Sequence, residues 1–177
     1  MAALNSKFDI LRGWPNSSAV AEDFVIPSTA NLGSHKFKQG QWVSLVDNSA
    51  GVMTCQTDMT AVNSNAIQSC YLIIEGRDDF SSQFANRVTC LLGGGYTVRL
   101  PQTAKDSSGA DYNILAAAAD QFAVGNRVKV VEGLLTKVDD ADISDNATAG
   151  DVANRAAVIG HVIATNDADN TIDIFVV

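Results

Sequence analysis

The densest group of chemically active side chains is an acidic segment in the C-terminal third of the chain. Asp140, Asp142, Ser144 and Asp151 occupy the first, third, fifth and twelfth places of a twelve-residue stretch. Calcium-binding loops place oxygen ligands at this spacing. The sixth place holds Asp145 where such loops turn on glycine, and the twelfth residue is not glutamate. The pattern favours a solvated acidic loop. Calcium is the one metal alternative, and no other cofactor is expected.

Histidines and glycines offer little further chemistry. His35 and His161 are the two histidines, and neither has a partner at a metal-ligand spacing. Gly93–Gly95 lead into the strand-like Tyr96–Leu100, whereas a phosphate-binding loop leads into a helix N-terminus. Catalysis requires a nucleophile, a base or a metal in convergent geometry, and no such set is recognisable. The sequence predicts no catalytic residues, and we do not expect an enzyme.

Aromatic and sulfur-containing residues are also sparse. Trp14 and Trp42 could belong to a sugar-binding platform, but Trp42 lies inside an expected strand, where burial is the more common role. The cysteines Cys55, Cys70 and Cys90 are odd in number and form no CxxC motif. We interpret them as partly buried thiols of a protein that folds first in a reducing cytoplasm.

Composition excludes several classes of function. The chain has 177 residues, with 12 Lys and Arg against 20 Asp and Glu, so its net charge is −8. Non-specific binding to nucleic acid or to anionic lipid needs clustered cations, so neither partner is expected. No run of about 20 apolar residues is present, which argues against a membrane-spanning helix.

The elements that must position these residues read mainly as β-strands. Alternating or β-branched runs bounded by Gly, Asn and Asp clusters are typical of strands and turns. One helix is expected at Asn113–Gln121, where four alanines follow Leu115, and Asp151–Arg155 could add a helical turn. The expected strands are 41–46, 52–55, 70–75, 87–92, 96–100, 127–131, 134–138, 156–164 and 171–177.

An internal repeat organises these strands. Phe37–Asp47 aligns with Phe122–Glu132 at an offset of 85, with Phe, Gly and Val recurring before an apolar–apolar–acid ending. Gly51–Thr54 then matches Gly133–Thr136 at an offset of 82, a turn three residues shorter. A single module of this size is marginally stable alone. We therefore predict a mainly β fold in which two related small antiparallel barrel or sandwich modules pack together, with one or two short helices.

The predicted domain organisation has four parts, which follow the repeat and the proline-punctuated start of the chain. They are an extended N-terminal arm over 1–34, a first β module over 35–100, a linker with a short helix over 101–119, and a second β module over 120–177. The arm carries apolar residues without periodicity, and exposure of such residues would be a liability. They are expected to dock on a partner or on the chain's own barrel; the candidate interface residues are Phe8, Ile10, Leu11, Trp14 and Phe24.

The C-terminal part resembles a known class of virion proteins. Phe122–Thr136, Ala157–Val162 and Asn170–Val177 resemble the small β modules of tailed-bacteriophage capsid decoration (cement) proteins. The resemblance covers 120–177 well and 37–92 more weakly. It implies a non-enzymatic structural protein that binds the major capsid protein on the outer capsid surface of the virion. It also implies a homo-oligomer, with a trimer favoured over a dimer. Another phage tail or fibre module, a cell-surface interaction module, or a carbohydrate-binding domain is the alternative.

Overall fold

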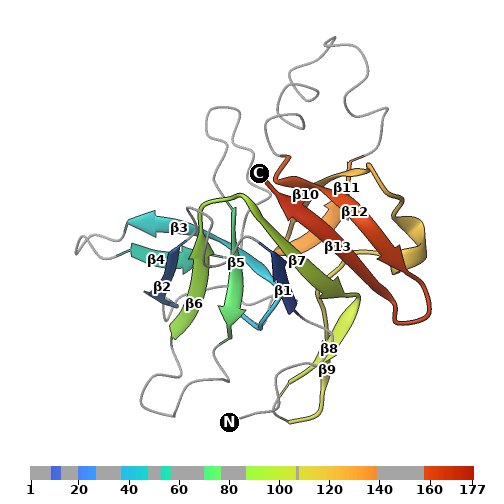
Figure 1. Ribbon diagram of the computed structural model, residues 1–177. Helices are drawn as coiled ribbons and strands as arrows, with labels where there is room; N and C mark the ends of the chain where they lie inside the picture. Colours follow the sequence, from blue (N-terminus) through green and yellow to red (C-terminus); the bar gives the residue numbers. More distant parts are fainter. Residues whose placement is uncertain are drawn as a thin grey trace.

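The computed structural model shows a mainly β protein, as predicted (Figure 1). It describes residues 9–12, 20–26, 37–47, 53–56, 70–76, 87–106, 108–138 and 158–177. The elements in these ranges are β1 (Asp9–Arg12), β2 (Val20–Val25), β3 (Trp42–Asp47), β4 (Met53–Gln56), β5 (Cys70–Glu75), β6 (Arg87–Leu92), β7 (Tyr96–Pro101), β8 (Thr103–Lys105), β9 (Asp111–Asn113), the 3₁₀ turn η2 (Ala119–Gln121), β10 (Arg127–Val131), β11 (Leu134–Lys137), β12 (Gly160–Asn166) and β13 (Thr171–Val176).

Two sheets contain most of these strands. The six-stranded sheet has the order β1-β7-β13-β12-β10-β11 and is antiparallel throughout. In the five-stranded sheet, β2, β6, β5, β3 and β4 follow one another through antiparallel ladders. Its pairing returns to β2 through a single parallel pair, Val25 with Thr54, so this sheet curls round on itself. β8 and β9 form a separate hairpin.

The sheets contain two copies of one pairing scheme. In the first unit the order is β4-β3-β5-β6-β2, and in the second unit it is β11-β10-β12-β13-β7. The registers agree as well, because Trp42 pairs with Leu72 where Arg127 pairs with His161. A β-bulge interrupts β5 between Ile73 and Glu75, and the corresponding bulge in β12 lies between Val162 and Ala164.

The turn before β3 and the turn before β10 are also equivalent. The Gly40 amide donates to the Ile73 carbonyl at 2.8 Å, and the Gly125 amide donates to the Val162 carbonyl at 2.8 Å. Gly40 has φ +87 and Gly125 has φ +90, a region that L side chains rarely adopt.

The side chain that closes this turn is equivalent too. The side-chain carbonyl of Gln41 accepts from the Lys38 amide, and that of Asn126 accepts from the Ala123 amide. Together with the shared registers, these bonds confirm the sequence repeat at an offset of 85.

Strand pairing divides the chain differently from the predicted boundaries. β2, which the sequence analysis placed in the arm, pairs with β6 over Val20–Val25. β7, placed at the end of the first module, pairs with β13 from the C-terminus. Each is the outermost strand of its unit, and its partner lies 62 or more residues away in sequence. Local pattern cannot assign such a strand, since only the long-range ladder determines its sheet.

The sheets pack as layers that share a core. On one side of the five-stranded sheet, Val43, Ile73 and Cys90 belong to a small core of the first unit. On its other side, Trp42, Leu72 and Leu91 join the larger core, which also holds the inner side chains of the six-stranded sheet. The outer surface of the first unit therefore packs against the inner surface of the second, in the manner of a sandwich.

The β8–β9 hairpin is bonded to the first unit at the turn before β3. The Tyr112 hydroxyl donates to the Gln39 carbonyl at 3.1 Å, and the Gln41 side-chain amide donates to the Asn113 carbonyl at 3.0 Å. Lys38 and Asp106 lie 3.7 Å apart as an ion pair. In this way the hairpin covers the turn that precedes β3.

The prediction of a helix at Asn113–Gln121 is wrong, since only its last three residues form a helical turn, the 3₁₀ turn η2. Ile114 and Leu115 are buried, and Leu115 forms a parallel bridge with Leu135 of β11. The Leu135 amide donates to the Ile114 carbonyl, and the Ala116 amide donates to the Leu135 carbonyl. These long-range bonds outweigh the helix propensity of the alanine run. The second expected helical turn, Asp151–Arg155, lies outside the described residues.

Candidate functional site

Part of the predicted arm is built into the fold. Ile10 and Leu11 lie in β1, whose backbone pairs with β7 at the edge of the six-stranded sheet. The Leu11 side chain is half-buried. This segment therefore completes the chain's own sheet, which is one of the two alternatives for the arm. Phe8 and Trp14 lie outside the described residues.

Phe24 requires a correction. It is expected at an interface with a capsid or another subunit, but only 6% of it is exposed and it packs in the small core of the first unit. The register between its strand, β2, and β6 places Phe24 opposite the buried Val88. Phe24 stabilises its own unit and leaves almost no surface for a partner.

The residues considered for metal binding and catalysis give no assembled centre in the described part of the chain. The candidate calcium ligands Asp140, Asp142, Ser144 and Asp151 lie outside it, as does His35. Within it, no group of three or more His, Cys, Asp or Glu side chains could hold a metal ion.

Other residues considered for chemistry occupy ordinary structural positions. Gly93–Gly95 form the turn between β6 and β7, as predicted. Trp42 is fully buried, so it cannot be part of a sugar-binding platform. Cys90 is buried, and burial raises the pKa of the Cys70 thiol to about 11. No helix in the described ranges is long and apolar enough to cross a membrane.

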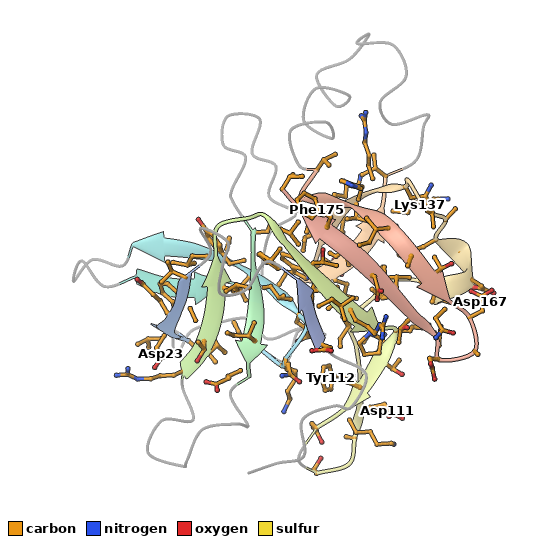
Figure 2. All side chains as sticks on the ribbon, viewed as in Figure 1. Asp23, Asp111, Tyr112, Lys137, Asp167 and Phe175 are labelled. Atoms are coloured by element: carbon orange, nitrogen blue, oxygen red, sulfur yellow. The ribbon has the colours of Figure 1, made fainter. Side chains whose placement is uncertain are left out.

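The arrangement best suited to binding is the outer side of the second unit. Arg127 on β10 lies directly opposite His161 on β12, which lies directly opposite Phe175 on β13. The His161 and Phe175 rings are 5.5 Å apart between centroids and tilted by 52°. Arg127 is exposed and the two rings are half-buried. We call this row of three residues the open row; Figure 2 labels Phe175 within it.

Two exposed apolar side chains lie beside the open row. Val124 is 67% exposed in the turn before β10, and Ile163 is 40% exposed at the bulge of β12. The Gly125–Val162 backbone hydrogen bond holds their segments together. In the first unit the position of Val124 is taken by Gln39, which is 7% exposed. The exposed copy of this turn is therefore more apolar than the buried copy, the reverse of what contact with water favours.

A second polar row crosses the first unit. The hydroxyl of Thr89 on β6 lies 2.7 Å from a carboxyl oxygen of Asp23 on β2 and 2.9 Å from one of Glu75 on β5. Thr89 is buried, whereas both carboxyl groups belong to exposed residues. We call these three residues the acid row.

The equivalent row of the second unit is neutralised internally. Arg99 donates two hydrogen bonds to Asp173, at 2.7 and 2.9 Å. These bonds, together with the charges of Asp173 and neighbouring Asp9, raise the pKa of Arg99 above its ordinary value, although desolvation opposes the shift. The two units thus differ in the charge that the same strand positions carry.

Sequence reasoning missed the open row because its members are 34 and 14 residues apart and meet only through strand register. The repeat offers a signal, since the offset of 85 aligns Arg127 with Trp42. A buried tryptophan and an exposed arginine at equivalent positions mark a surface that is covered in the first unit and exposed in the second.

Comparison with known proteins gives no identification. The chain matches no protein-family model, no curated protein and no solved structure.

Proposed function

We propose that the chain is a non-enzymatic virion structural protein that binds the outside of a phage capsid and stabilises it. Its partner is the major capsid protein, and it acts as a homo-oligomer, a trimer rather than a dimer, on the outer capsid surface after first folding in the host cytoplasm. The observation that carries the proposal is a fold built from two copies of one β unit around a shared core. Such a fold presents sheet faces and edges to partners.

The placement of the resembling residues supports this proposal. The segments that resemble decoration proteins fall on β10 and β11, on β12, and on β13. These strands are consecutive neighbours in the six-stranded sheet, so the resemblance involves one continuous surface. A decoration protein gains affinity by avidity, because many modest contacts reinforce one another on a regular shell.

The test uses the purified full chain and empty shells assembled from the major capsid protein of the phage that carries this chain. The chain should co-sediment with the shells and appear at symmetry-related sites in averaged images, and decorated shells should withstand a higher temperature than bare shells. Saturable binding to a tail or fibre component, with none to shells, would instead support the alternative of a tail or fibre module.

The contribution of the arm needs a narrower deletion than the whole segment. Removing residues 1–27 would delete β1 and β2, which are strands of the two sheets. Removing residues 1–8 leaves both strands, and Phe8→Ser with Trp14→Ser removes two candidate attachment side chains. We expect weaker shell binding with an unchanged melting transition. Val20→Ser, at an exposed apolar position of β2 outside the resembling segments, is the matched control. Equal binding by all variants would show that residues 1–8 and Trp14 are not the anchor.

A further inference from the structure

The open row carries a cation with no ion-pair partner in the described part of the chain. Arg127 is exposed, and its nearest cross-strand neighbour is His161. With Val124 and Ile163 beside it, the surface combines one guanidinium, two half-buried rings and two exposed aliphatic side chains. Arginine and aromatic residues are enriched at the centres of protein interfaces.

The acid row carries the opposite charge and could accept a cation. A threonine hydroxyl has one hydrogen, so Thr89 can donate to Asp23 or to Glu75 but not to both at once. One carboxylate oxygen therefore lies near the hydroxyl without receiving its hydrogen, and two negative charges converge there. Arg87, two residues before Thr89 on β6, is the nearby cation on the same strand, so the charge of the group remains net negative.

We propose that the open row of one copy of the chain binds the acid row of a second copy. A planar guanidinium suits two convergent carboxylates, since it offers several donors in a fixed fork. A second copy is the occupant because this strongly acidic chain supplies the complementary carboxylates itself. The contact joins two different surfaces, so it is heterologous. It forms a closed ring if the rotation between copies closes, and an open chain if it does not.

The two rows are positioned so that one chain cannot satisfy both. Figure 2 shows Asp23 on the five-stranded sheet and Phe175 on the six-stranded sheet, well apart across the molecule. The contact must therefore be intermolecular. The inference rests on the homo-oligomer of the proposed function and deepens it by naming the contact between copies, and it can be tested on the purified chain without shells.

The test is the oligomeric state of the full chain from about 5 to 200 µM, measured by sedimentation velocity in a single low-salt buffer, where charge contacts are least screened. The wild-type chain should associate in this range, and Arg127→Glu should weaken association by about tenfold or more. Lys105→Glu makes the same change in charge on the exposed β8–β9 hairpin and should leave association within about twofold of wild type.

Charge exchange makes the test specific to the two rows. Asp23→Lys with Glu75→Lys should likewise weaken self-association by about tenfold or more, and mixing this variant with Arg127→Glu should restore a complex between the two. The milder pair Asp23→Asn with Glu75→Gln serves if the lysine variant melts early. A wild-type chain that stays monomeric to about 200 µM, equal effects of Arg127→Glu and Lys105→Glu, or no complex on mixing would overturn the inference. A chain that stays monomeric in solution and still decorates shells would overturn this inference and the proposed homo-oligomer, but it would leave the proposed capsid binding intact.

Discussion

The two units place very different side chains at the same three strand positions. In the first unit these positions hold Trp42, Leu72 and Leu91, which are fully buried in the larger core. In the second unit they hold Arg127, His161 and Phe175, which stay on the outer side. The backbone pairing is shared, so the difference arises from what covers each sheet. The first unit uses this surface to pack against the second unit, whereas in the second unit Arg127 stays exposed and the His161 and Phe175 rings stay half-buried.

The largest loss of stability should come from truncating a residue of the covered row, by which we mean Trp42, Leu72 and Leu91. Trp42→Ala removes a fully buried ring from the contact between units, and truncation of such a side chain costs about 3–5 kcal/mol. Arg127→Ala changes an exposed side chain at the equivalent position and should stay within about 0.5 kcal/mol. Urea unfolding at low micromolar concentration measures both. Similar losses in the two variants would contradict the assignment of one covered and one open row.

The paired glycines give a second contrast. An alanine Cβ at Gly40 would lie 2.7 Å from Cδ1 of Ile114, whereas nothing lies within 4 Å at Gly125. Both positions have positive φ, which costs an L residue about 1–2 kcal/mol. Gly125→Ala should lose only that amount, and Gly40→Ala should lose about 1–3 kcal/mol more because the site is already filled. Thermal unfolding of the two variants checks the difference, and equal losses would mean that the β8–β9 region does not press on the first turn.

Substitutions in the acid row and in the equivalent Arg99–Asp173 pair should lower stability less than the two preceding changes. Asp173→Ala breaks the paired hydrogen bonds with Arg99 and should cost about 1 kcal/mol, since the arginine is partly exposed and screened by solvent. Thr89→Val keeps the shape of its side chain and leaves two exposed carboxylates to water, so the expected change is within about 0.5 kcal/mol. The difference in unfolding free energy between Asp173→Ala and Thr89→Val should shrink in 1 M salt. A larger cost for Thr89→Val would show that the hydroxyl holds the acid row together.

The smallest effect on stability is expected in the β8–β9 hairpin. The described residues of the first unit contain no equivalent hairpin. The Ser108 hydroxyl donates to Asp106, and amides of Ser108 and Ala110 add to it, lowering the pKa of Asp106 to about 2. The ionised carboxylate therefore stabilises the hairpin above pH 3.8, and this contribution is lost as the pH falls toward 2. An NMR titration of the carboxyl carbon should show this pKa. Ser108→Ala should raise it toward 3.8, and an unchanged value would contradict the cause.

Long-range pairing explains most differences between expectation and structure. Leu115 and the following alanines favour a helix locally, but the bridge from Leu115 to Leu135 holds this segment extended. Ile10 and Phe24 look alike in an arm without periodicity. Pairing with β7 places Ile10 at the edge of the six-stranded sheet, whereas pairing with β6 places Phe24 in the small core of the first unit. No local signal separates these two outcomes.

The sequence by itself indicated most of the strands and the duplication, but not β1, β2, β8 and β9. β-branched runs bounded by turn residues specify extended backbone, and Gly40 and Gly125 mark the same left-handed turn because few other residues tolerate its φ. The tertiary structure alone decided which copy of each surface is covered. Burial depends on what another segment brings to a face, and that segment is distant in sequence, as Gly133 is from Trp42, whose backbone amide donates to the Gly133 carbonyl. The open row and the acid row therefore become visible only once both sheets are assembled.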